Sequence, residues 1–170
     1  MKEKLREVAK TSRLLKGQST DRWLVLKDLA STKALGAAIA RTFSSFTTVL
    51  LLEGPLGVGK TSLIKGLAAE AGIEEPITSP TFSIAQHYPN GNPPLIHLDL
   101  YRLENPQEAD LICLQEEEEA QAIRGIIAVE WPERLTLQLP EALRISMRYQ
   151  DKEEGRIAQL SGLDIEATNS

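Results

Sequence analysis

The residues best suited to chemistry lie in one glycine-rich run, 54–61, which reads Gly-Pro-Leu-Gly-Val-Gly-Lys-Thr. It satisfies the pattern G-x-x-x-x-G-K-[ST] at every fixed position. In such a loop the glycines let backbone N–H groups turn towards phosphate oxygens, and the following helix adds the partial positive charge of its N-terminus. We expect Lys60 to reach the terminal phosphates and the Thr61 hydroxyl to bind Mg²⁺. The predicted nucleotide-binding residues of this region are Gly54, Leu56, Gly57, Val58, Gly59, Lys60, Thr61 and Ser62.

Two acidic residues in apolar surroundings are candidates for the metal side of the same site. Asp99 lies in the apolar-rich run 95–101, and Glu130 ends the run 125–130. A P-loop site needs an acid at the end of a neighbouring strand to hold the metal or to orient its waters. Either residue alone is equally well explained as a solvent-facing acid, but the pair favours a site. Direct ligand, water-mediated ligand and general base all stay open as roles for each.

The segments around these residues predict alternating strands and helices. The run 47–53 is β-branched and then continuously apolar, which is typical of a strand buried on both faces of a parallel sheet. Ser31 and Thr32 are the expected N-caps of a first helix. Asn90 and Gly91 form a turn signal within a hairpin. The expected strands cover 23–26, 47–53, 81–88, 95–101, 125–130, 142–149 and 156–160, and two further helices cover 60–71 and 106–123.

These segments describe one α/β domain, a three-layer P-loop NTPase fold with a mixed, mostly parallel central sheet and antiparallel additions. A chain of 170 residues is long enough to bury one such core. We divide it into a polar, basic N-terminal extension (1–21), the P-loop ATPase domain (22–165) and a short tail (166–170).

The net charge of −5 is unevenly spread along the chain. Residues 1–22 hold seven Lys or Arg and three acidic residues, for a charge of +4, which leaves −9 for the remainder. A body of that sign repels phosphate backbones, which disfavours direct nucleic-acid binding. No apolar run approaches the roughly 20 residues of a membrane span, no apolar signal segment follows Met1, and Cys113 is the single cysteine. We therefore expect a cytoplasmic protein without membrane contact.

Four motifs occur in order within residues 23–150, and together they resemble the TsaE family, the small bacterial ATPases of tRNA threonylcarbamoyladenosine biosynthesis. The glycine loop is shared by many proteins, whereas the S-P-T, D-L-Y-R and E-W-P set beside it is specific. Pro55 departs from the Asp that is common there, but this side chain points away from the phosphates in most P-loops. The motifs are 54–61, Thr-Ser-Pro-Thr-Phe at 78–82, His-Leu-Asp-Leu-Tyr-Arg-Leu at 97–103 and Val-Glu-Trp-Pro-Glu at 129–133.

The resemblance implies roles for the site residues. Lys60 and Thr61 would bind phosphates and magnesium, and Asp99 and Glu130 would be the essential metal-side acids.

It also implies that residues 79–81 form a mobile, switch-like loop in which a hydroxyl senses the γ-phosphate. Thr81 is therefore a candidate catalytic residue beside the two acids. Trp131 is assigned to a wall of the nucleotide pocket or to a partner surface, with a large core residue as the alternative. Thr32 is placed on the nucleotide by family-like spacing.

Three side chains outside these roles have expected environments. His97 shares a strand face with Asp99 and is expected to be buried and hydrogen-bonded rather than a ligand or base. Arg102 is expected to form a structural ion pair, with a phosphate contact as the alternative. Cys113 is expected to be a small core thiol rather than a nucleophile.

The leading interpretation is a magnesium-dependent ATPase that serves as an accessory subunit in tRNA modification, with ATP and Mg²⁺ as cofactors. By resemblance its partners are the TsaD and TsaB subunits, which transfer a threonylcarbamoyl group to adenosine beside the anticodon, and the ATP cycle resets that assembly. The chain would meet tRNA only through the complex. A small-molecule P-loop kinase and a non-catalytic, nucleotide-dependent interaction module are the alternatives. A GTPase is disfavoured because no N-K-x-D motif occurs.

Overall fold

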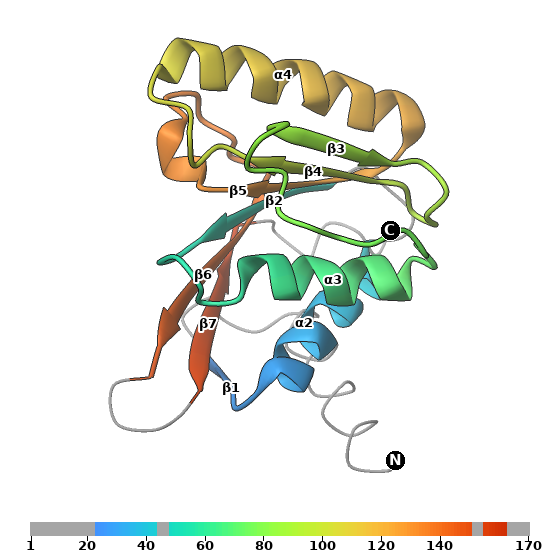
Figure 1. The fold of residues 1–170 in the computed structure, drawn as a ribbon, viewed down its shortest axis with the longest axis vertical. Helices are drawn as coiled ribbons and strands as arrows, with labels where there is room; N and C mark the ends of the chain where they lie inside the picture. The colour runs from blue at the N-terminus through green and yellow to red at the C-terminus, as the bar shows by residue number, and fades with distance from the viewer. Residues whose placement is uncertain (1–22, 44–47, 151–154, 163–170) are drawn as a thin grey trace.

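A computed structural model of the chain describes residues 23–43, 48–150 and 155–162. The predicted extension 1–21 and tail 166–170 lie outside the described residues. Within them, the chain forms a seven-stranded sheet with helices on both faces (Figure 1). In spatial order the strands are β1 (Trp23–Leu26), β7 (Arg156–Ser161), β6 (Leu143–Tyr149), β2 (Thr48–Glu53), β5 (Ile126–Glu130), β4 (Leu95–Asp99) and β3 (Ala85–Tyr88).

The centre of the sheet is parallel and its margins are antiparallel, as the sequence predicts. β2 runs parallel to both β5 and β6, and β4 runs parallel to β5. β1 and β7, β6 and β7, and β3 and β4 pair in antiparallel fashion. The apolar runs of β4 and β5 are buried along their whole length, which is the expected environment for parallel strands covered on both faces.

The helices form the two outer layers. α2 (Leu29–Thr42) and α3 (Lys60–Glu70) lie on one face of the sheet, and α4 (Pro106–Ile123) lies over β3, β4 and β5 on the other (Figure 1). Two apolar cores result, one beneath α2 and α3 and one beneath α4. None of the helices within the described residues has the length and apolar character that a membrane span requires.

The backbones of α2 and α3 touch at two glycines. A Cβ on Gly36 would lie 2.0 Å from the carbonyl oxygen of Leu63, and a Cβ on Gly66 would lie 2.0 Å from the carbonyl oxygen of Lys33. Neither position has room for a side chain. The helix that follows the phosphate loop is therefore held directly against its neighbour.

The start of α2 differs from the prediction. Asp28 is the N-cap, because its Oδ1 accepts a hydrogen bond from the Ser31 backbone N–H at 2.7 Å while the Ser31 hydroxyl receives the Asp28 N–H at 3.0 Å. Ser31 is the third residue of this capping box. The Thr32 hydroxyl donates to the Asp28 carbonyl at 3.1 Å. The assignment of Ser31 and Thr32 as caps was wrong, because an acid one turn earlier fills that role.

The strand predicted at 81–88 is shorter than expected, since β3 comprises only Ala85–Tyr88. The residues before it form a turn in which the Ile84 N–H bonds to the Pro80 carbonyl at 2.6 Å, with Ile84 in the left-handed region at φ 66°. The predicted hairpin of this segment with 95–101 is confirmed by the β3–β4 pairing.

Candidate functional site

The glycine loop joins β2 to α3 and has the backbone of a phosphate cradle. Gly54, Gly57 and Gly59 have φ values of 135°, 77° and 114°, a region that residues with a Cβ rarely adopt. Val58 between them is fully buried and anchors the loop in the core. α3 begins at Lys60, directly after Gly59, so the unpaired N–H groups of its first turn belong to the loop.

The Lys60 ammonium lies folded back on the loop. Its Nζ donates hydrogen bonds to the carbonyl oxygens of Gly54 at 2.6 Å and Pro55 at 3.1 Å, and it lies 4.1 Å from the centroid of the Trp131 ring. Burial lowers the pKa of Lys60 below its ordinary 10.5, while the negative charges of Glu130, Glu133 and Asp99 act in the opposite direction. The two carbonyl oxygens accept hydrogen bonds from a desolvated ammonium group, and phosphate oxygens could accept the same hydrogen bonds.

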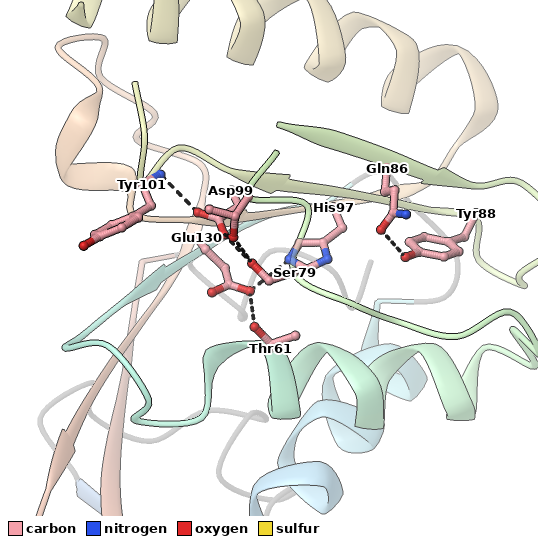
Figure 2. A network of polar contacts seen from close by, with 9 residues as sticks. Thr61, Ser79, Gln86, Tyr88, His97, Asp99, Tyr101 and Glu130 are labelled. Carbon is pink, nitrogen blue, oxygen red and sulfur yellow. Dashed lines mark hydrogen bonds and ion pairs between the residues drawn. The ribbon is translucent and has the colours of Figure 1, made fainter. Parts of the chain in front are cut away.

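Glu130, at the end of β5, meets the loop through Thr61. The Thr61 hydroxyl donates to Glu130 Oε1 at 2.7 Å, and His97 Nε2 lies 2.9 Å from the same oxygen (Figure 2). Glu130 is 4% exposed and His97 is fully buried. Because a hydroxyl has one proton and two lone pairs, the Thr61 oxygen can still bind a cation while it donates to Glu130.

Asp99, at the end of β4, lies beside Glu130 because the two residues are directly opposite each other in the parallel register. Its Oδ2 accepts hydrogen bonds from the Ser79 hydroxyl and, at 2.8 Å, from the Thr81 hydroxyl. Its Oδ1 accepts the Tyr101 backbone N–H at 3.0 Å (Figure 2). The loop expected to be switch-like is thus attached to an acid of the site.

Trp131 follows Glu130 in a left-handed conformation, with φ 62° and ψ 48°. This backbone turn directs the chain away from the sheet and allows the ring to cover Lys60. The ring also packs against Tyr101, with centroids 4.9 Å apart and an angle of 46° between the planes. Trp131 therefore forms a wall of the site, and it also packs against the core beneath α4.

These residues line an open cleft of about 340 Å³. This volume is at the lower end of the range for small-molecule sites.

The residues that line the cleft differ in part from those that the sequence predicts. The ring of Tyr101 lines it and was not predicted. Three predicted residues lie outside the lining: Gly54 and Val58 support the loop, and Thr32 is buried with its Cγ2 3.5 Å from the position of a Cβ on Gly59. The lining residues are Leu56, Gly57, Gly59, Lys60, Thr61, Ser62, Ser79, Thr81, Asp99, Tyr101, Glu130 and Trp131.

The oxygen donors at the floor of the cleft fit Mg²⁺. The hydroxyl of Thr61 and the carboxylates of Asp99 and Glu130 are hard ligands, and magnesium sites of this kind use one or two carboxylates with substrate phosphates completing the shell. No cluster of three or more His, Cys, Asp or Glu side chains suited to a metal exists in the described part of the chain. The donor set therefore fits a metal that arrives together with phosphates.

Three predicted environments can be compared with the structure. His97 is buried and hydrogen-bonded as expected. Cys113 is 1% exposed, and burial raises the pKa of its thiol to about 12, which confirms a core role. Arg102 lies over the Phe82 ring, with its Cζ 4.2 Å from the ring centroid, and none of the ion pairs among the described residues includes it. The D-L-Y-R motif drew attention to Arg102 in the sequence, but it did not indicate that the side chain would stack on Phe82.

Comparison with known proteins agrees with this arrangement. A family model described as threonylcarbamoyl adenosine biosynthesis protein TsaE matches residues 26–158. The tRNA threonylcarbamoyladenosine biosynthesis protein TsaE of Nostoc sp. is 42% identical over 130 residues, which cover 76% of this chain and 79% of the relative. The protein of the same name from Bacillus subtilis is 39% identical over 127 residues, which cover 74% and 77%.

The same relationship is found among solved structures. The crystal structure of Bacillus subtilis YdiB superposes with a TM-score of 0.59 and 31% sequence identity, and the match covers 82% of this chain and 84% of that one. The family and the P-loop fold imply nucleotide binding and a role within an assembly of several subunits. From the matched span, the shared fold and the arrangement of the cleft, we conclude that the chain belongs to the TsaE family.

Proposed function

We propose that this chain is a magnesium-dependent ATPase that acts as an accessory subunit in the threonylcarbamoyladenosine modification of tRNA. Its partners would be subunits that resemble TsaD and TsaB, and its ATP cycle would reset that transferase complex between turnovers. The names of the relatives support the pathway, since they are tRNA threonylcarbamoyladenosine biosynthesis proteins. The cleft supports the ATPase activity.

The observation that carries the proposal is the hydrogen bond of 2.7 Å from Thr61 to Glu130, with Asp99 opposite Glu130 in the sheet. It joins the first turn of the helix after the loop to the acid at the end of the neighbouring strand. A nucleotide held by the loop would place its terminal phosphates between these groups. A structural turn without a ligand does not require two buried carboxylates at that point.

Each residue has a definite task in this proposal. Lys60 leaves the carbonyl oxygens of Gly54 and Pro55 and binds the β- and γ-phosphates. Thr61, Asp99 and Glu130 would hold Mg²⁺ or its waters, and the bound ion would neutralise the charge that develops on the phosphates during transfer. Trp131 excludes water from one side of the ammonium.

Hydrolysis then requires an oriented water. Its oxygen forms a bond to the γ-phosphorus as the bond from that phosphorus to the β–γ bridging oxygen breaks. ADP retains that electron pair, and the proton of the water passes to a carboxylate of the site or to the phosphate that is released. Glu130 or Asp99 orients the water through its carboxylate. Thr81, now bound to Asp99 at 2.8 Å, is placed to exchange that bond for one to the γ-phosphate.

The charge of the chain is consistent with indirect contact to tRNA. Residues 23–170 carry a net charge of −9, and residues 1–22 carry +4. A body with that negative charge repels phosphate backbones, so a partner rather than this chain would hold the nucleic acid. We expect slow hydrolysis by the isolated subunit and faster hydrolysis in the complex, because an added group can complete a phosphoryl-transfer site.

The test is a reconstituted modification assay with TsaD- and TsaB-like subunits, tRNA and a donor of the threonylcarbamoyl group. We expect this chain and ATP together to allow many turnovers per complex, and either one alone to allow about one. The Glu130→Gln variant should behave as if the chain were absent, whereas Glu118→Gln, an exposed acid on α4 outside the cleft, should behave as wild type. Equal turnover with and without this chain would refute the proposal, and phosphorylation of a metabolite would favour the kinase.

A further inference from the structure

We propose that Arg156 binds the α-phosphate of the nucleotide, so that the β6–β7 hairpin forms the nucleoside side of the site. The inference rests on the proposed function, because it takes a nucleoside triphosphate as the occupant of the loop. It adds a residue from the C-terminal part of the chain, about 100 positions away from the glycine loop in the sequence.

Arg156 begins β7 and lies directly against the loop. Its Cδ and Cζ are 3.5 Å and 3.7 Å from the position that a Cβ on Gly59 would occupy. Its Nη1 donates a hydrogen bond to the Thr32 hydroxyl at 3.4 Å. The guanidinium therefore lies beside the residue that precedes Lys60, which is the part of a P-loop that wraps the phosphates.

Within the described residues, the Arg156 guanidinium forms one hydrogen bond, from Nη1 to the Thr32 hydroxyl. Among the described residues, its Nε is buried without a hydrogen-bond partner, and none of the ion pairs includes Arg156. A guanidinium carries five N–H donors in a fixed plane that matches phosphate oxygens. A partly buried positive charge without a carboxylate is unfavourable unless an anion compensates it. A phosphate at this point would supply both the charge and the acceptors.

The order of the strands indicates which phosphate this is. β5 and β4, which carry Glu130 and Asp99, lie on one side of β2, and β6 and β7 lie on the other. The γ-phosphate belongs on the side of the acids, because Thr61 donates to Glu130 there and the Lys60 ammonium lies against Trp131, the residue after Glu130. A triphosphate that passes through the loop must leave it on the opposite side. The α-phosphate is the group that reaches Arg156 there.

The hairpin is fixed to the loop at a second point. Tyr149, which is opposite Arg156 in the β6–β7 register, donates its hydroxyl to the Leu56 carbonyl at 3.2 Å. The same hydroxyl oxygen lies 3.1 Å from the position of a Cβ on Gly57. The end of the hairpin thus touches the loop beside Gly57 and beside Gly59. This contact joins the strand end that carries Arg156 to the loop.

The experiment measures the dissociation constant of Mg·ATP by calorimetry and that of magnesium pyrophosphate by displacement. Pyrophosphate has two phosphates instead of three, and the Mg²⁺ bound beside Thr61 and the acids favours the β and γ positions for them. We expect Arg156→Ala to weaken ATP binding about tenfold and Arg156→Lys to weaken it less, because Lys keeps the charge but not the fork. Pyrophosphate affinity should change less than twofold. Arg148→Ala is the matched control, since Arg148 is one position away in the register and stacks on Trp23 at 4.3 Å, away from the loop.

Several outcomes would overturn the inference. ATP affinity within twofold of wild type in Arg156→Ala would remove it. So would equal loss of ATP and pyrophosphate affinity in that variant, because the loop itself would then be disturbed. A wild-type chain that binds no ATP would refute the proposed function instead. Melting temperatures without ligand show that each variant is folded.

Discussion

The two sides of the phosphate loop are built differently. On the side of β4 and β5, the sheet is covered by helices on both faces, and the functional side chains are buried: Asp99 and Glu130 are each 4% exposed and His97 is fully buried. On the side of β6 and β7, the helices of the described residues cover one face (Figure 1), and Tyr149 is 49% exposed. The first side holds carboxylates and the second holds a tyrosine and an arginine.

This difference separates two tasks. Buried carboxylates in a fixed hydrogen-bond network are already oriented, so they can act on the reacting phosphate with little reorganisation. Partly exposed side chains on a hairpin lose few contacts with the rest of the protein when they bind a ligand. They are therefore better suited to binding the nucleotide than to catalysing its hydrolysis. We therefore expect substitutions on the acid side to lower the rate of hydrolysis, and substitutions on the hairpin side to lower nucleotide affinity.

The largest effect should come from Glu130→Gln. The amide can still accept the Thr61 hydroxyl, but the negative charge at the metal is lost. We expect ATP hydrolysis to fall about 10²–10⁴-fold, the range for loss of a positioned acid–base group, while ATP binding remains measurable. Stopped-flow hydrolysis and calorimetry on the same preparation test both values. Equal loss of binding and turnover would show that Glu130 is structural and would end the proposed separation.

Lys60→Ala acts at the boundary between the two sides. Removing the ammonium deletes charge-assisted hydrogen bonds of about 1.5–3 kcal/mol each, so ATP affinity should fall about 100-fold or more. The ligand-free protein should stay folded, because loss of a desolvated cation offsets the loss of its bonds to Gly54 and Pro55. Calorimetry and thermal melts measure the two quantities, and Lys65→Ala, on the same helix, is the control. Unchanged ATP affinity would contradict the assignment of the loop.

Substitutions of His97 test whether its hydrogen bond orients the buried carboxylate of Glu130. His97→Leu removes the nitrogen 2.9 Å from Glu130 Oε1, and we expect hydrolysis to fall about tenfold with ATP affinity unchanged. His97→Gln returns an N–H donor near that nitrogen and should recover most of the rate. A Gln variant as slow as the Leu variant would show that His97 contributes only packing.

The smallest effect is expected on the hairpin side, from Tyr149→Phe. This change removes the hydroxyl that donates to Leu56 at 3.2 Å and leaves the ring. One hydrogen bond in a partly exposed position is worth about 0.5–1.5 kcal/mol, so ATP affinity should fall two- to tenfold with no change in the rate at saturating ATP. A slower rate at saturation would remove the distinction between the two sides.

Much of the fold can be predicted from sequence because the central strands have strong local signals. The continuous apolar runs in 47–53 and 125–130 identified β2 and β5, and the glycine loop located the start of α3. The segment 81–84 was mistaken for strand because Thr81 and Ser83 alternate with apolar residues. Its conformation depends instead on a long-range contact, the binding of the Thr81 hydroxyl to Asp99.

The residues of the site could be predicted from the sequence, but the hydrogen bonds between them could not. Lys60, Thr61, Asp99 and Glu130 stand out by motif or by position after apolar runs. The bond between His97 and Glu130 depends on the register of two parallel strands, which the local pattern does not specify. Arg156 had no signal at all, because a single arginine in a weak strand is an ordinary surface residue until the sheet is assembled.

The contact between α2 and α3 has a consequence for sequence variation in proteins of this type. Since a Cβ at Gly36 or Gly66 would overlap a backbone carbonyl of the other helix, neither glycine can change unless the two helices separate. Separation would shift Thr32, on α2, away from Gly59 and break its hydrogen bond with Arg156, and so alter the nucleotide site. Glycine at both positions should therefore mark chains with an intact site independently of the phosphate-loop motif, and loss of one glycine should be accompanied by loss of the other.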